Sequence, residues 1–281
     1  MLKQIDQFLQ DTLLNFETQI DWRFAFRGSS LPCCPRQLLL GKFFSGAENF
    51  NKIESFTTRY HFHVGRAVHA LAQETWAAQG LLWGDWRCLD HERCGIAFYN
   101  KRLESGKCIR CGAPAEYIEK EIHDVETGFS GHCDGVLWCP PLNGYVVAEL
   151  KTRNHNIIKA ASEPYVSDLY QVSAYATLLF RKYQLPIMGR LILWIGKPQP
   201  QPHKFWFYPG LGESLADEQL RLKRILDEAL RSKDFSTVKG ICSTPKDVEK
   251  KNCPFGGICL SPSCDKLIAN EFSEWVSRNL D

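Results

Sequence analysis

Two apolar runs joined by a tight turn constrain the fold of this chain more than any other feature. The runs are residues 131–138 (GHCDGVLW) and residues 144–152 (GYVVAELKT). The segment Pro140-Pro141-Leu142-Asn143 lies between them and is followed by Gly144. Proline fixes φ and an Asn-Gly pair tolerates positive φ, so this segment predicts a turn between two antiparallel strands.

The hairpin predicts a cluster of three charged side chains. Asp134 lies in the first run, while Glu149 and Lys151 lie two residues apart in the second and share one face of the strand. Leu150 between them would point to the opposite, packed side. Two carboxylates placed in this way can hold one or two Mg²⁺ or Mn²⁺ ions, which prefer oxygen ligands. Such ions activate water for attack on a phosphate, and the lysine can orient or deprotonate that water.

A third element follows the hairpin. Gln171 and Tyr175 are four residues apart on a helix expected over about residues 166–182, so they share a face. The order of Asp134, then Glu149-Leu150-Lys151, then Gln171-x-x-x-Tyr175 resembles the PD-(D/E)xK nuclease superfamily. The closest resemblance is to its RecB-like exonucleases, including the AddB nuclease domain and the CRISPR-adaptation nucleases with an iron–sulfur cluster. An exposed ion pair would explain E-x-K by itself, but not the hairpin and the downstream pair as well.

The resemblance implies an α/β fold with a restriction-endonuclease-like core, in which helices flank a mixed central sheet. Members of the group carry an upstream G-x-x-x-H helix, and Gly65-Arg66-Ala67-Val68-His69 matches it. The implied ligands of Mg²⁺ or Mn²⁺ are His69, Asp134, Glu149 and the carbonyl of Leu150. Lys151 would act on the attacking water, and Gln171 and Tyr175 would face the active site and touch DNA. His61 and His63 are nearby alternatives to His69.

Four cysteines interrupt the match to this family: Cys88, Cys94, Cys108 and Cys111. The ending Cys108-x2-Cys111-Gly is typical of a zinc knuckle, where glycine lets the backbone close around the metal. The first half is looser, because five residues separate Cys88 from Cys94 and His91 lies midway as an alternative fourth ligand. The sequence predicts a zinc-binding insertion that folds only with its metal. DNA or partner contact and a purely structural role both remain open for it.

The remaining cysteines indicate a clasp between the two ends of the chain. In the resembled nucleases, an early C-P-R and a late C-x2-C-x5-C bind one [4Fe–4S] cluster. The candidate ligands here are Cys34, Cys242, Cys253 and Cys259, with Cys33 and Cys264 as alternates. Cys253 and Cys259 match the x5 pair, but Lys250 stands where the first cysteine of that triplet would be. The C-terminal cysteines could therefore bind zinc by themselves instead.

Composition limits the protein class. The chain has 281 residues, of which 44% are hydrophobic, enough for one substantial core or a core with a small satellite. Its net charge of +2 points to no nucleic-acid partner by itself, so any attraction for DNA must come from a local patch. The sequence shows neither an apolar run long enough to span a membrane nor a signal peptide, which predicts a cytoplasmic protein. Twelve cysteines in that compartment indicate metal binding rather than disulfides.

The predicted organisation has four parts: 1–83 (helical, with the first cluster cysteine and the G-x-x-x-H helix), 84–114 (the zinc insertion), 115–235 (the catalytic core) and 236–281 (the terminal cysteines and a closing helix). Helices are expected at 1–20 and 215–232, strands at 116–125, 189–197 and 203–209, and a mobile polar link at 152–164. Glu119 or Glu121 on the strand at 116–125 could approach the metal site, although an exposed strand face explains both more simply.

These patterns predict a metal-dependent DNA nuclease. The resemblance points to an exonuclease acting on DNA ends or single strands, as in recombination, repair or CRISPR adaptation. DNA is the expected partner, along with other recombination or replication proteins, and no membrane. One alternative is a metal-stapled DNA-binding or scaffold protein with an inactive site, which the intact D…ExK…QxxxY disfavours. The other is a sequence-specific endonuclease, which the His69 helix and the cysteine clasp disfavour.

Overall fold

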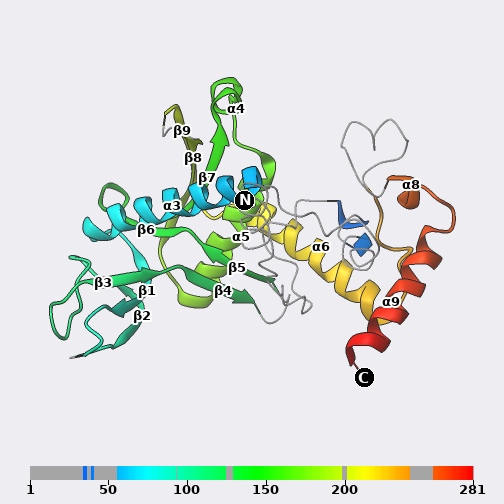
Figure 1. Cartoon of the computed structure of the whole chain (residues 1–281), viewed down its shortest axis with the longest axis horizontal. Coiled ribbons are helices and arrows are strands. Elements are labelled where there is room, and N and C mark those ends of the chain that lie inside the picture. Colours follow the sequence, from blue (N-terminus) through cyan, green and yellow to red (C-terminus); the bar gives the residue numbers. More distant parts are fainter. Residues whose placement is uncertain are drawn as a thin grey trace, which may run out of the picture.

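The structure of the protein is a computed structural model that describes residues 34–36, 39–40, 56–92, 94–124, 129–197, 201–240 and 256–280. Over these residues the chain has the mixed α/β fold that the sequence predicts (Figure 1). The strands in this part of the chain form a three-stranded sheet (β2-β1-β3), a two-stranded sheet (β4-β5) and a four-stranded sheet (β6-β7-β8-β9). None of the helices seen there is both long and apolar enough to cross a membrane.

The four-stranded sheet contains the predicted hairpin. Its strands are β6 (Gly135–Cys139), β7 (Gly144–Asn154), β8 (Ile187–Lys197) and β9 (His203–Pro209). β6 and β7 are antiparallel, and Asn143 in the turn has the expected left-handed conformation, with φ 48°. β7 and β8 are parallel, whereas β8 and β9 are antiparallel.

Two helices make the crossover between the parallel strands β7 and β8. They are α4 (His155–Ala160) and α5 (Val166–Tyr183). The expectation of a polar link over 152–164 is therefore wrong, because β7 continues to Asn154 and α4 begins directly after it. The side chain of Asn154 caps α4 by accepting the N–H of Asn156 at 3.0 Å, which stabilises a helix as short as this one.

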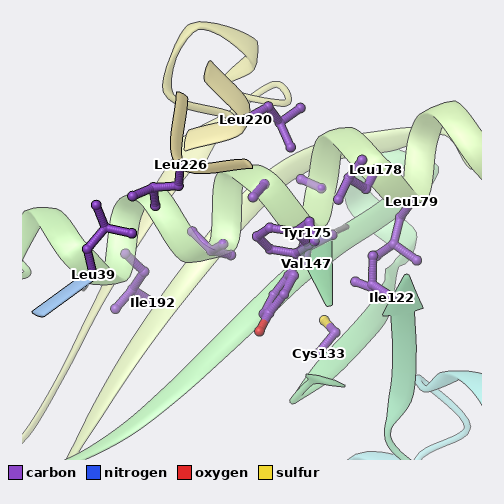
Figure 2. Packing of buried hydrophobic residues seen from close by; sticks show 14 of the residues in the cluster. Leu39, Ile122, Cys133, Val147, Tyr175, Leu178, Leu179, Ile192, Leu220 and Leu226 are labelled. Carbon is purple, nitrogen blue, oxygen red and sulfur yellow. The ribbon is translucent and has the colours of Figure 1, made fainter. Parts of the chain in front are cut away.

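The main core lies between the four-stranded sheet, α5 and α6 (Glu213–Ser232). Figure 2 shows Tyr175 of α5 beside Val147 of β7, and Leu178 and Leu179 of α5 belong to the same cluster as Ile192 of β8. Leu220 and Leu226 of α6 belong to the same cluster, so α5 is packed between the sheet and α6. The opposite face of β7 contacts α3 (Phe56–Ala78), which contains the predicted G-x-x-x-H helix.

The two smaller sheets meet at a single residue. β1 (Trp83–Cys88) pairs with β2 (Ala97–Arg102) and β3 (Ala115–Ile118), and β4 (Lys120–Asp124) pairs with β5 (Phe129–Cys133). The single strand expected over 116–125 is thus broken at Glu119, because the chain changes its pairing partner there. A second small core joins β1 to β6 and contains Leu82, Trp86, Leu103, Leu137 and Ala148.

The two ends of the described chain pack together. The C-terminal part contains α8 (Gly256–Cys259) and α9 (Cys264–Leu280), and Arg36 forms an ion pair with Asp265 at the start of α9. Leu39 lies in the main core cluster together with Phe272 of α9. Figure 1 shows this segment near residue 40 beside α6 and the C-terminal helices. The helix predicted over 1–20 lies outside the described residues.

Candidate active site and metal centre

A cleft of about 820 Å³ opens between α3 and β7. On α3 its wall is formed by Phe62, Arg66, His69 and Gln73, which are three or four residues apart and so lie on one face of the helix. Gly65 lies on the same face, where an added Cβ would come 3.4 Å from Thr152 Oγ1 of β7, so glycine allows the two elements to approach closely. The G-x-x-x-H pattern therefore places His69 in the cleft.

The carboxylate of Asp134 contacts both β7 of the hairpin and α3. Its Oδ2 accepts the backbone N–H of Leu150 at 2.7 Å, and its Oδ1 lies 3.1 Å from Nδ1 of His69. Burial acts to lower the pKa of His69, but the hydrogen bond and the charge of Asp134 outweigh it, so the net shift is upward. Asp134, Leu150 and His69 all line the cleft.

Glu149 lies deeper, on the side of β7 that faces α5. It is 1% exposed, and its Oε1 is 2.5 Å from Nζ of Lys151. Its Oε2 has no hydrogen-bond partner among the described residues. Burial raises the pKa of Glu149 well above the usual range, and the charge of Asp134 adds to this shift. A buried carboxylate oxygen without a partner is costly and suits a site for a cation.

Lys151 connects Glu149 to the predicted pair on α5. Its Nζ donates to Oε1 of Gln171 at 3.2 Å, and Nε2 of Gln171 donates to Oη of Tyr175 at 3.1 Å. Both α5 side chains are buried. A Cβ at Gly131 would lie 2.4 Å from Oη of Tyr175, so glycine leaves the space that the tyrosine occupies. The structure thus joins Glu149, Lys151, Gln171 and Tyr175 in one polar chain.

Beyond Lys151, the cleft becomes basic. Arg153 and Lys197 line it together with Arg66. Asp168 of α5 accepts two hydrogen bonds from Arg153, both at 3.1 Å, and one from Nε1 of Trp194 at 2.9 Å. The guanidinium of Arg153 also lies over the rings of Tyr165 and Trp194. These contacts fix the Arg153 side chain beside the cleft.

Glu119 joins the site, although the sequence favours an exposed strand face for it. Donor atoms of His69, Glu119 and Asp134 all lie within 4.8 Å of one another, and Glu149 lies outside this set. Glu121, the other candidate, is exposed. The break between β3 and β4 turns Glu119 towards Asp134, and this break depends on strand pairing that local sequence does not encode.

The four cysteines of the insertion come together. Their sulfur atoms lie within 4.8 Å of one another, with separations of 3.5 Å for Cys88–Cys111 and 3.7 Å for Cys94–Cys108. Four thiolates around a tetrahedral zinc, at about 2.3 Å each, would be about 3.8 Å apart. His91, the alternative ligand, is not in this set. We refer to residues 83–118, which contain β1, β2, β3 and the four cysteines, as the cysteine module.

Two tight turns aim the cysteines of the module inward. Gly95 and Gly112, which follow Cys94 and Cys111, have φ of 56° and 73°, and the N–H of Gly112 donates to the carbonyl of Cys108 at 2.9 Å. Burial acts to raise the pKa of the Cys108 thiol, but backbone N–H groups outweigh it and bring the value to about 7. Burial raises the pKa of Cys88 to about 12, so only a bound cation would make all four thiols ionise together.

The described part of the terminal clasp brings its two ends close. Cys34 and Cys264 are buried, and Arg36 pairs with Asp265, the residue after Cys264. A Cβ at Gly240 would contact both Sγ of Cys259 and the Arg36 side chain, at 3.3 and 3.7 Å. The other candidate ligands, Cys33, Cys242 and Cys253, lie outside the described residues.

Comparison with known proteins assigns no family. No protein-family model matches the chain, and no curated protein matches it. Fifteen chains of solved structures match. One is the crystal structure of SSO0001, with 12% sequence identity, a TM-score of 0.49, and coverage of 92% of this chain and 98% of that one. Since a likeness at this level identifies neither a family nor an activity, any functional conclusion depends on the side chains of the site.

Proposed function

We propose that this protein is a nuclease of the PD-(D/E)xK type that hydrolyses DNA phosphodiester bonds with Mg²⁺ or Mn²⁺. The observation that carries the proposal is the polar chain of Glu149, Lys151, Gln171 and Tyr175 next to Asp134. Two of these residues come from β7, two from α5, and Asp134 lies just before β6. Asp134 and Lys151 line the cleft, and the other three are buried behind Lys151. A solvated ion pair would be exposed, whereas Glu149 is buried beneath Lys151.

The site fits a hard divalent cation. Its donors are carboxylates and an imidazole, and Oε2 of Glu149 is a buried acceptor without a partner in the described structure. His69, Asp134, Glu149 and the carbonyl of Leu150 would hold the ion. When bound, it would supply Lewis-acid activation of the phosphate and of water.

The protein's own groups position the substrate. Lys151 is held by both Glu149 and Gln171, so its ammonium has a fixed place beside the scissile phosphate, where it would orient the attacking water and stabilise developing negative charge. Arg66, Arg153 and Lys197 would bind the phosphates that follow along the strand. Phe62, which is 59% exposed at the wall of this cleft, would stack on a base.

The cleft has a basic end, formed by Arg66, Arg153 and Lys197, and an acidic end around Asp134. Such a cleft could hold the phosphates of a single strand or of a frayed DNA end at the basic end, with the cation at the acidic end. Stacking on Phe62 requires an unpaired base, which favours an exonuclease over a duplex-reading endonuclease. Recombination, repair or CRISPR adaptation are the settings in which such ends arise, with other proteins of those pathways as partners. DNA as substrate and reduced cysteines as ligands are both consistent with action in the cytoplasm.

The cysteine sites would have separate metals. The four thiols of the cysteine module suit a structural zinc ion, since their spacing matches tetrahedral coordination. Cys34, Cys259 and the terminal cysteines outside the described residues would hold a [4Fe–4S] cluster, or zinc in its place. Iron and acid-labile sulfide in anaerobically purified protein would separate these two possibilities.

The test is digestion of end-labelled single- and double-stranded DNA with Mn²⁺. We expect the wild-type protein to shorten single strands from an end, and Asp134→Ala and Lys151→Ala to abolish cleavage with an unchanged circular dichroism spectrum. A fully active Asp134→Ala protein would refute the assignment. Tight binding of single strands without any cleavage would favour the DNA-binding scaffold, whose supporting observation is the same basic, aromatic end of the cleft.

A further inference from the structure

Glu119 is the single residue between two sheets. Ile118 before it ends β3 and pairs with Asp85 of β1 in the cysteine module. Lys120 after it begins β4 and pairs with Cys133 of β5, the residue before Asp134. The cysteine module and the catalytic hairpin are therefore joined directly at Glu119.

Strand register sets Glu119 against Asp134. Because Lys120 is opposite Cys133 in an antiparallel pair, the next positions along the two chains are Glu119 and Asp134. Directly opposite residues in such a pair have Cβ atoms about 4.5–5.5 Å apart. The two side chains therefore start from neighbouring positions, and their carboxylate oxygens lie within 4.8 Å of each other and of a ring nitrogen of His69.

Two further contacts fix this position. Nε2 of Gln73, one turn after His69 on α3, donates to Oε1 of Glu119 at 2.9 Å and to the carbonyl of Asp134 at 3.0 Å. Nζ of Lys120 donates to both carboxylate oxygens of Asp85 at 3.0 and 2.9 Å. The side chains of this ion pair are only 8% and 16% exposed, so β4 is locked to β1 of the module.

We propose that Glu119 is a ligand of the catalytic divalent cation together with His69 and Asp134, and that the cysteine module positions it. Two carboxylates so close repel each other unless a cation lies between them, and the imidazole of His69 completes three donors of the kind that Mn²⁺ accepts. A metal bound by the four cysteines would thus hold β3 in place, and β3 would hold Glu119 where it can bind the cation in the cleft. This inference rests on the proposed nuclease function, from which it takes the cation, and it adds Glu119 as a fourth side-chain ligand and the dependence of that ligand on the module.

The first test measures Mn²⁺ binding without DNA, by isothermal titration calorimetry. Glu119→Gln keeps the size and the Gln73 contact but removes the charge. Glu121→Gln is the matched control, since Glu121 lies two residues away on β4 and is exposed. Because even the loss of an outer partner of a metal ligand weakens metal binding by about 10–100-fold, we expect at least about tenfold weaker binding in Glu119→Gln. Wild-type affinity in Glu119→Gln would overturn the inference.

The second test measures coupling to the module. Cys108→Ser/Cys111→Ser removes two thiolates, and we expect it to weaken Mn²⁺ binding by a factor similar to that of Glu119→Gln. Adding Glu119→Gln to this variant should cause little further loss, since both changes act through the same carboxylate. Fully additive losses would refute positioning by the module. Asp85→Asn is the alternative variant if the double cysteine variant does not fold, because it breaks the Lys120–Asp85 ion pair without changing a cysteine. Combined with Glu119→Gln, it should give the same non-additive loss of Mn²⁺ affinity.

Binding and cleavage separate the two proposals. Mn²⁺ binding that depends on Glu119, in a protein that cleaves no DNA, would retain this inference and discard the nuclease. Metal-dependent cleavage in a protein whose Mn²⁺ affinity is unchanged by Glu119→Gln would discard the inference alone.

Discussion

Replacing Glu149 with glutamine should stabilise the metal-free protein and abolish its cleavage of DNA. Glu149 is 1% exposed, and its Oε2 has no hydrogen-bond partner among the described residues. Glutamine has the same shape but no charge, so it removes the cost of burying a carboxylate. Lys151 loses its ionic partner but keeps its bond to Gln171, and its side chain is 24% exposed to water.

The expected gain is the difference between two opposing contributions. A buried polar group without a partner costs about 1–3 kcal/mol, and more when it is charged. The side-chain amide of glutamine would also lack a partner at the position of Oε2, and the ion pair with Lys151 would be lost. Both effects reduce the gain in the free energy of unfolding. We expect a net increase in the free energy of unfolding of about 1 kcal/mol, or a Tm about 2–4 °C higher in a chain near this size.

Thermal unfolding followed by circular dichroism, with EDTA and then with excess Mn²⁺, measures both effects. In EDTA the variant should melt above the wild type. At about 100 times its Kd, Mn²⁺ should stabilise the wild type by about 2.7 kcal/mol, and the variant much less, so the order of the two melting curves reverses. Glu121→Gln should change neither curve. A variant less stable than the wild type in EDTA, or one that gains as much from Mn²⁺, would refute the reasoning.

Three other substitutions test separate parts of the site. Phe62→Ala should weaken binding of single-stranded DNA by about 1–3 kcal/mol in fluorescence anisotropy, while duplex binding changes little; equal losses for both would exclude base stacking. Asp168→Ala leaves Arg153 without its carboxylate and should lower the free energy of unfolding in urea by about 3–5 kcal/mol; a loss under about 1 kcal/mol would mean that water replaces Asp168. Gly131→Ala would displace Tyr175 and should reduce cleavage while calorimetry shows unchanged Mn²⁺ binding; wild-type cleavage would show that Tyr175 is dispensable.

The hairpin was predictable because its determinants are local. Pro140 and Asn143 specify the turn, and the two-residue period of a strand then places Glu149 and Lys151 on one face. The helical spacing of Gln171 and Tyr175 is equally local, and the structure bonds Gln171 to both Lys151 and Tyr175.

Features that depend on pairing between distant strands were not predictable. The residues around Glu119 alternate like one continuous strand, yet Ile118 pairs with β1 and Lys120 pairs with β5. Nothing in the segment itself marks this change of partner. The basic wall of the cleft was missed for a similar reason, since Arg66, Arg153 and Lys197 are far apart in sequence and meet only when α3 lies across β7.

The packing of the two chain ends also determines the order in which the protein can fold during synthesis. Arg36 and Asp265 are 229 residues apart. At about 5–20 residues per second, a ribosome would need roughly 10–50 seconds to make the chain between them. The hairpin of β6 and β7 and α5 are complete well before that, whereas Leu39 and Leu40, which are fully buried in the folded protein, share their core cluster with Phe272 of α9, which is made much later. Leu39 and Leu40 can therefore pack against β8, α5 and α6 first, and this core is completed only when α9 joins it.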